Sequence, residues 1–223
     1  MSRAQAKPEH RVVSPVGFRG LYAVTPDDPD IGSLVRKVRK ALAGGARILQ
    51  YRNKSANAAL RREQGVALLA LCREARVPLV INDDLGLARA IGADGLHLGR
   101  NDISIGAARA RLGEDRLLGV SCYDRLELAL AAREAGADYV AFGSAFPSAT
   151  KPEATRAPLS LYREASARLD SPIVAIGGIT TENAHAVIEA GADAVAVISA
   201  LFDAPDIEAA ARSFSRLFDK KNP

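Results

Sequence analysis

Short apolar runs recur along the chain and alternate with segments in which apolar residues are spaced as on one face of a helix. The runs lack the apolar-polar alternation of a half-exposed strand, which is typical of parallel strands covered by helices on both faces. We expect strands near residues 18–24, 48–52, 78–81, 95–98, 117–121, 139–142, 172–176 and 194–198.

The segments between these strands have helical spacing. Leu34, Val38 and Leu42 fall on one helical face, and similar spacing recurs over residues 60–70 and 126–131. About eight strand-helix units in one chain is the count of a TIM barrel. We therefore expect a single (β/α)8 TIM barrel of the α/β class, with an open doubly wound sheet as the alternative.

A short phrase of glycine, alanine and a charged residue precedes several of the apolar runs. It reads Gly92-Ala93-Asp94, Gly136-Ala137-Asp138 and Gly191-Ala192-Asp193, with Gly45-Ala46-Arg47 as a variant. Glycine ends a helix readily because it adopts a left-handed backbone without a Cβ clash. The phrase therefore indicates a helix end followed by a buried strand.

The composition suits one large globular domain. The chain has 223 residues, of which 48% are hydrophobic and 25% charged. We expect a catalytic domain over residues 18–219, a flexible N-terminal tail over residues 1–17 and a C-terminal tail over residues 220–223. Cys72 and Cys122 show no metal-type spacing, and no base lies near Cys122 in sequence, so a cytoplasmic protein without a cysteine nucleophile is expected.

Charge and hydropathy exclude several partners. The net charge is +4, but the basic residues are scattered and tryptophan is absent, which argues against nucleic-acid binding. No run approaches the roughly 20 apolar residues that span a membrane, and residues 1–17 do not resemble an export signal. We expect small anionic substrates, no nucleic acid and no membrane, and we allow for a homo-oligomer.

Polar clusters follow several of the expected strands. If the strands are parallel, these clusters open at one end of the sheet, where barrel active sites lie. Gln50, Arg52 and Lys54 alternate along one side of an extended segment, so an amide and two cations should point into the barrel mouth. A guanidinium fork and a mobile ammonium suit a diphosphate, whereas the alternative is a solvated strand end.

Acidic residues follow the next two strands. Asp83 and Asp102 should reach one ion from neighbouring strands, and magnesium prefers such carboxylates together with substrate phosphate. The alternative for Asp84 and Asp102 is a helix cap, which we prefer for Asp84. His97 lies within a strand, where a satisfied core histidine is the better interpretation, and no Ser-His-Asp set suggests acyl transfer.

The last two expected strands are followed by loops that suit a phosphate. Gly177 and Gly178 allow close approach of backbone N–H groups, and Ile198 and Ser199 follow the eighth strand. The loop over residues 143–151 carries hydroxyls and a lysine, so we expect a lid that holds a second phosphate or the leaving group.

Six motifs in this order resemble the thiamine phosphate synthase family, also called thiamine-phosphate pyrophosphorylase. They are Gln-x-Arg-x-Lys from residue 50, Ile-Asn-Asp-Asp from 81, Asp-Gly-x-His-x-Gly-x-x-Asp from 94, Gly-Val-Ser from 119, Phe-Pro-Ser-x-Thr-Lys from 146 and Ala-Ile-Gly-Gly-Ile from 175. The resemblance covers about residues 18–202.

That resemblance implies a magnesium-dependent transferase. It would join 4-amino-2-methyl-5-hydroxymethylpyrimidine diphosphate to 4-methyl-5-(2-hydroxyethyl)thiazole phosphate, releasing pyrophosphate through a pyrimidine methylene cation. Gln50 would contact the pyrimidine, and Asp83 and Asp102 would bind Mg2+. The diphosphate would be held by Arg52, Lys54, Asn82, Ser121 and Lys151, with Arg52, Lys54, Ser121 and Lys151 as the catalytic set. The thiazole phosphate would be held by Ser148, Thr150, Gly178, Ile198 and Ser199.

The chain departs from the family pattern at three positions. Arg100 stands where glutamine is usual, Ser144 where proline is frequent and Ser148 where threonine is frequent. Arg100 would either perturb the metal site or point to solvent. The alternative functions are a thiazole tautomerase-like isomerase of the same family, a non-catalytic phosphate-ligand sensor and an unrelated barrel isomerase, but the full set of cations and carboxylates favours the synthase.

Overall fold

Eight parallel strands close into a barrel. The computed structural model describes residues 18–147 and 155–219. The strands pair in sequence order, and β1 closes the barrel against β8 with Tyr22 opposite Ala196. The strands are β1 (Gly20–Val24), β2 (Ile48–Tyr51), β3 (Leu79–Asn82), β4 (Gly95–Leu98), β5 (Leu117–Tyr123), β6 (Tyr139–Phe142), β7 (Ile173–Ile176) and β8 (Ala194–Val197).

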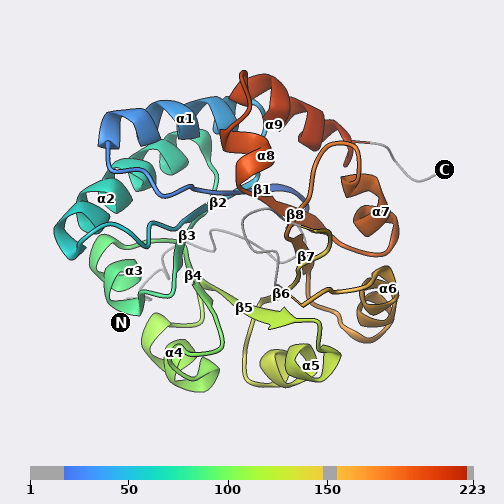
Figure 1. The fold of residues 1–223 in the computed structure, drawn as a ribbon. Helices are drawn as coiled ribbons and strands as arrows, with labels where there is room; N and C mark the ends of the chain where they lie inside the picture. Colours follow the sequence, from blue (N-terminus) through green and yellow to red (C-terminus); the bar gives the residue numbers. More distant parts are fainter. Residues whose placement is uncertain (1–17, 148–154, 220–223) are drawn as a thin grey trace, which may run out of the picture.

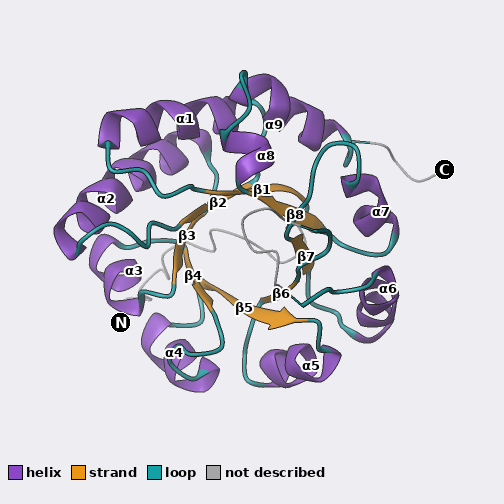
Figure 2. Ribbon diagram, viewed as in Figure 1, coloured by secondary structure: helices purple, strands orange, loops and turns teal. Residues whose placement is uncertain are grey.

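Helices surround the barrel on the outside, as Figure 1 and Figure 2 show in a view down its axis. The helices are α1 (Ile31–Ala43), α2 (Ala58–Ala75), α3 (Leu85–Ile91), α4 (Ile105–Leu112), α5 (Leu126–Glu134), α6 (Leu159–Arg168), α7 (Ala184–Glu189), α8 (Ser199–Phe202) and α9 (Ile207–Arg216). The expected (β/α)8 TIM barrel is confirmed, and the doubly wound alternative is excluded by the pairing of β1 with β8.

Two apolar clusters fill the domain. The larger cluster lies between the strands and the helices and includes Leu34 and Val38 of α1. The smaller one gathers alternate strand residues of the barrel interior, together with Phe18 below β1. Its members are Phe18, Tyr22, Val24, Ile48, Val80, Leu117, Tyr139, Ala141, Val174, Ala194 and Ala196. The interior is therefore a packed core that supports the site above it.

The repeated Gly-Ala-Asp phrase has a structural role at the opposite end of the barrel. Each glycine has positive φ, as at Gly92 with 70°, and lies at a helix end as expected. Each aspartate accepts a backbone N–H from the first or second residue of the strand beside it. Asp94 accepts from Leu79 at 2.9 Å, Asp138 from Leu118 at 2.7 Å and Asp193 from Ile173 at 2.9 Å. The phrase thus ends a helix and fixes the start of a neighbouring strand.

The buried face of α2 differs from the expected one. Residues 60, 66, 67, 69 and 70 were expected to share that face, but Val66 is 51% exposed. Leu69 is buried as expected, but the other buried side chains are Gln64, Leu68, Leu71 and Cys72. The buried face was misassigned because Gln64 lies on it, and hydrophobic periodicity alone places a glutamine on the solvent side.

None of the helices within residues 18–147 and 155–219 is long and apolar enough to cross a membrane. The two predicted tails, residues 1–17 and 220–223, lie outside the described residues, so their assignment stays a prediction.

Candidate active site

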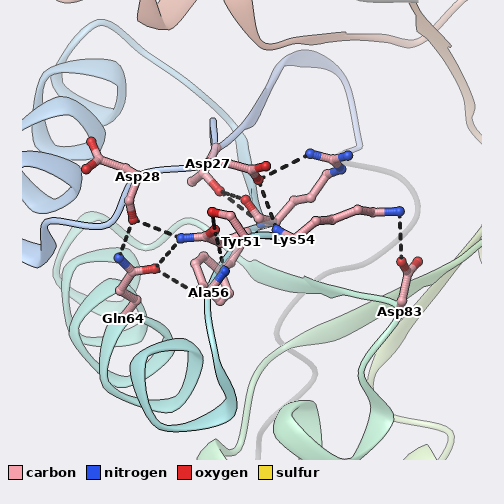
Figure 3. A network of polar contacts seen from close by, with 11 residues as sticks. Asp27, Asp28, Tyr51, Lys54, Ala56, Gln64 and Asp83 are labelled. Carbon is pink, nitrogen blue, oxygen red and sulfur yellow. Dashed lines mark hydrogen bonds and ion pairs between the residues drawn. The ribbon is translucent and has the colours of Figure 1, made fainter.

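Side chains continue to alternate between the outside and the inside of the barrel for a few residues beyond the end of β2. Tyr51 and Asn53 point outward, where the Tyr51 hydroxyl donates to Gln64 Oε1 at 2.7 Å and Asn53 Nδ2 donates to the same oxygen at 3.0 Å. Figure 3 shows Lys54 reaching the other way, toward Asp83. Because Tyr51 and Asn53 point outward, the residues that alternate with them should point inward. This supports the expectation that Gln50, Arg52 and Lys54 share one side of the segment.

Residues of the loop after β1 hold this segment in place. Thr25 Oγ1 donates to the Arg52 carbonyl and accepts the Arg52 N–H, both at 2.9 Å. Asp27 Oδ1 accepts the Lys54 N–H at 2.9 Å and lies 3.5 Å from Arg52 Nη1. Sequence reasoning missed Thr25 and Asp27, because their partners lie on another strand-loop unit.

Gln64, on α2, also holds residues 51–53 in place through hydrogen bonds. Its Nε2 donates to the Asp28 carbonyl at 2.8 Å, and Asn53 Nδ2 donates to that carbonyl at the same distance. Tyr51, Asn53 and Gln64 are all buried, so these bonds have no competing water (Figure 3). The network fixes the backbone from which the two cations project.

A cation and two carboxylates meet at the ends of β2, β3 and β4. Lys54 Nζ lies 3.7 Å from Asp83 Oδ2. Asp102 lies close enough to Asp83 to raise the pKa of its carboxyl group. Asp83 has a φ of 61°, a left-handed conformation that is uncommon outside glycine and often found at functional sites. The expected convergence of Asp83, Asp102 and Lys54 is therefore present.

The carboxylate pair is electrostatically strained. Burial raises the pKa of Asp83, the neighbouring Asp102 raises it further, and Lys54 and the Asn82 amide act in the opposite direction. Asp102 Oδ2 accepts the Gly99 N–H at 2.6 Å and so is held by the loop after β4. Two carboxyl groups in one partly buried place repel unless a proton or a cation lies between them.

Asp84 and Asp102 have different roles. Asp84 Oδ1 accepts the Leu87 N–H at 2.8 Å, which makes Asp84 the N-cap of α3, as preferred from the sequence. The cap of α4 is Ser104, so Asp102 is left free of capping. The oxygen donors of Asp83 and Asp102 fit a divalent cation such as magnesium. Within the described parts of the chain, no group of three or more metal-ligating side chains occurs, so substrate and water oxygens would complete the shell.

Hydrogen bonds join Gln50 to Ser121 through three buried side chains. Gln50 Nε2 donates to Tyr22 Oη at 2.9 Å, and Tyr22 Oη lies 2.7 Å from Tyr139 Oη. His97 Nδ1 lies 3.1 Å from Tyr139 Oη, and His97 Nε2 lies 2.9 Å from Ser121 Oγ. His97 is thus the satisfied core histidine that was expected. Sequence reasoning missed both tyrosines, although their inward register and polar tips were a usable signal.

The glycine pair after β7 lies beside the loop after β8. Ile176 pairs with Ala196, which brings Gly178 and Ile198 to equivalent positions two residues further on. Gly178 has a φ of 63°, and a Cβ there would collide with the carbonyl oxygens of Pro147 and Phe146. Ser199 begins α8. The structure therefore brings Gly178, Ile198 and Ser199 together at the same end of the barrel as the carboxylate pair.

Two of the three unusual residues are explained by their contacts. The side chain of Arg100 is exposed, and its guanidinium lies over the Tyr123 ring, 4.5 Å from the ring centroid. The Ser144 hydroxyl donates to the Phe146 carbonyl at 2.6 Å. Ser148, Thr150 and Lys151 lie outside the described residues, so their assignments stay predictions.

Cys122 is fully buried, and burial raises the pKa of its thiol to about 12. A protonated, inaccessible thiol is not a nucleophile, which agrees with the sequence interpretation.

A closed parallel barrel with a carboxylate pair, cations and a glycine-rich turn at the carboxyl ends of its strands defines a (β/α)8-barrel enzyme of the kind that handles phosphorylated small molecules. The model of the family described as thiamine monophosphate synthase matches residues 21–201. This chain belongs to that family.

Curated relatives agree over nearly their whole lengths. The chain is 55% identical over 202 residues to the thiamine-phosphate synthase of Aromatoleum aromaticum, covering 91% of this chain and 97% of the relative. It is 56% identical over 204 residues to that of Chromobacterium violaceum, covering 92% and 98%.

Solved structures give the same result. Thiamine phosphate pyrophosphorylase from Pyrococcus furiosus superposes with a TM-score of 0.82 at 35% identity, covering 91% of this chain and 96% of that one. A 3-hexulose-6-phosphate synthase structure, at 19% identity and a TM-score of 0.66, shares the fold alone.

Proposed function

We propose that this enzyme condenses 4-amino-2-methyl-5-hydroxymethylpyrimidine diphosphate with 4-methyl-5-(2-hydroxyethyl)thiazole phosphate, giving thiamine phosphate and pyrophosphate. The observation that carries the proposal is the meeting of Lys54, Asp83 and Asp102 at the barrel mouth, with 3.7 Å between Lys54 Nζ and Asp83 Oδ2. Membership of the thiamine monophosphate synthase family supplies the reaction.

The bond between the pyrimidine methylene carbon and the diphosphate oxygen breaks first, and its electron pair leaves with the oxygen. Arg52 and Lys54 stabilise the negative charge that develops on the leaving group, together with the Asn82 amide and the Ser121 hydroxyl. The aminopyrimidine stabilises the resulting methylene cation, and Gln50 orients the ring. The thiazole nitrogen lone pair then forms the new C–N bond.

The metal proposed for this site is magnesium, held by Asp83 and Asp102. When bound it supplies a Lewis acid for the diphosphate oxygens. The raised pKa of Asp83 supports this assignment, because a pair of carboxyl groups that is hard to ionise together favours a bound cation. Lys54 contacts Asp83 in the absence of substrate and is long enough to contact the diphosphate, so it lies between the metal site and the leaving group.

The thiazole phosphate binds on the other side of the mouth. The backbone at Gly178, Ile198 and Ser199 offers N–H groups, and Gly178 has no side chain in the way, which suits a phosphate monoester. Ser148 and Thr150 add hydroxyl donors, and Lys151 contacts the diphosphate. These three roles rest on the family motif, since the residues lie outside the described ranges.

The isomerase and sensor alternatives receive less support. An isomerase needs a proton-transferring pair, yet His97 is buried, bonded at both ring nitrogens and has its pKa lowered to about 4. A sensor would gain little from a metal aimed at a leaving group. Cytoplasmic location and homo-oligomerisation stay predictions.

The direct test mixes the purified protein with both precursors and magnesium, and follows thiamine phosphate by mass spectrometry and pyrophosphate by a colorimetric assay. We expect equal amounts of the two products, and no product when a chelator removes magnesium. Pyrophosphate without thiamine phosphate, or neither product, would refute the condensation. Product formation undiminished by the chelator would refute only the metal assignment.

A further inference from the structure

A buried chain of hydrogen bonds crosses the barrel interior and joins two residues of the proposed site. Its members come from five different strands, and both tyrosines are at most 1% exposed, so water does not reach the middle of the chain. In order they are Gln50, Tyr22, Tyr139, His97 and Ser121. Each hydroxyl and each neutral imidazole has only one hydrogen to donate, so the sense of one bond fixes the sense of the next.

The direction is set at the Gln50 end. Gln50 Nε2 is a donor and cannot accept, so Tyr22 Oη accepts from it. The single Tyr22 hydrogen is then directed at Tyr139 Oη, 2.7 Å away. Tyr139 in turn has one hydrogen, and its remaining partner is His97 Nδ1 at 3.1 Å.

The tautomer of His97 decides whether Ser121 accepts or donates in the last hydrogen bond of the chain. A neutral imidazole that accepts at Nδ1 carries its hydrogen on Nε2, which lies 2.9 Å from Ser121 Oγ. The ring is buried and both its nitrogens have hydroxyl partners, so a neutral imidazole avoids the cost of a buried charge. Ser121 Oγ therefore accepts within the chain, and its own hydrogen is not used by any member of it.

We propose that this chain is a directional positioning device that presents an acceptor at one end of the site and a donor at the other. With Nε2 committed to Tyr22, Gln50 turns its Oε1 toward the substrate and accepts from an amino group. With its oxygen committed to His97, Ser121 donates its hydrogen to an anionic oxygen. Tyr22, Tyr139 and His97 are positioning residues that act through Gln50 and Ser121, and the assignment of substrates to the two ends rests on the proposed function.

The reversed chain has an opposite consequence. If Gln50 accepted from Tyr22 through its Oε1, every bond would reverse and His97 would carry its hydrogen on Nδ1. Ser121 would then donate to His97 Nε2 and present only lone pairs to the diphosphate, which repel an anion. The His97 tautomer therefore distinguishes the two directions, whatever reaction the protein catalyses.

The tautomer is measured on the wild-type protein with 15N-labelled histidine by NMR near pH 7.5. The His97 signals are assigned by their loss in His97→Gln, since the chain has only two other histidines, His10 and His185. We expect a neutral ring with its hydrogen on Nε2. A hydrogen on Nδ1, or a charged ring at this pH, would overturn the proposal.

Kinetics of Tyr139→Phe test the positioning role. The variant keeps the ring but removes the central hydroxyl, so His97 loses its donor at Nδ1 and the tautomer is no longer fixed. We expect kcat/KM for the pyrimidine diphosphate to fall about tenfold or more, the scale of one hydrogen bond to a charged group, with KM for the thiazole phosphate unchanged.

The matched control is Tyr162→Phe. The Tyr162 hydroxyl is also fully buried, but it donates to the Phe142 carbonyl at 3.0 Å, outside the chain. The control should leave kcat/KM and the His97 tautomer unchanged. Equal kinetics in the two variants would refute the positioning role. A wild-type protein that forms no thiamine phosphate would refute the proposed function, and the tautomer would still decide the direction of the chain.

Discussion

Lys54 Nζ lies 3.7 Å from Asp83 Oδ2, although the two residues follow different strands and are separated by a whole helix. The contact is partly exposed, so as a surface ion pair it contributes little to stability. The contact matters because it places the flexible Lys54 ammonium group beside the two carboxylates at the barrel mouth.

Asp83→Asn should abolish magnesium-dependent turnover. Asparagine tolerates the left-handed backbone found at Asp83, so the fold is retained while one carboxylate charge is lost. We expect kcat to fall by about 100-fold or more, with thiazole phosphate binding unchanged by calorimetry. Asp84→Ala is the control, since loss of that N-cap should cost about 1 kcal/mol of unfolding free energy and spare turnover. Normal magnesium-dependent kinetics in Asp83→Asn would contradict the metal assignment.

Gly178→Ala should weaken thiazole phosphate binding. A methyl group there meets the Pro147 and Phe146 carbonyl oxygens and must displace that loop. We expect a several-fold higher KM for the thiazole phosphate, measured by initial rates, besides a loss of about 1 kcal/mol from positive φ. Gly92→Ala, with a similar φ of 70° and its nearest contact at 3.9 Å, should show only the loss of stability. Equal KM values in the two variants would exclude Gly178 from this subsite.

Gln64→Leu should reduce both stability and diphosphate affinity. The substitution leaves the buried Tyr51 hydroxyl and Asp28 carbonyl short of partners, at a cost of about 2–4 kcal/mol in denaturant unfolding. The loop that carries Arg52 and Lys54 should loosen, which raises KM for the pyrimidine diphosphate. Val66→Ala on the exposed face of the same helix should change neither quantity. A stable variant with normal KM would show that the network does not position the loop.

His97 should make stability fall in mild acid. Its pKa is about 4 in the fold and about 6.5 when unfolded, so between these values the unfolded chain binds the extra proton. The stabilisation is complete above pH 6.5 and is lost as pH falls toward 4, at up to about 1.4 kcal/mol per pH unit. The charge of Asp102 acts in the opposite direction and raises the pKa of His97. Denaturant unfolding across this range should show a shallower slope for His97→Gln, and identical slopes would contradict the buried neutral ring.

Lys151→Ala should slow departure of the diphosphate. If Lys151 neutralises the leaving group, single-turnover pyrophosphate release should slow by about 100-fold. Lys40→Ala, an exposed lysine of α1, provides the comparison. Unchanged single-turnover rates would remove Lys151 from the mechanism.

The sequence by itself determined the eight strands and their alternation with helices, because these depend on neighbours in the chain. Glycines after helices, apolar runs and the Asp84 cap act within a few residues, so all eight strands could be placed to within about two residues at either end. The outward-inward alternation around Gln50 is local too, and it continued past the end of β2.

Only the tertiary structure decided which polar groups meet. Tyr22 and Tyr139 are 117 residues apart in the sequence. Their hydroxyl groups meet because both side chains point from their strands into the interior of the closed barrel. Asp27 and Gln64 hold the Lys54 segment from separate elements, and no local pattern links them. Barrel closure sets these distances through the register of all eight strands together, so the hydrogen bonds across the interior could not be predicted from any one segment of the sequence.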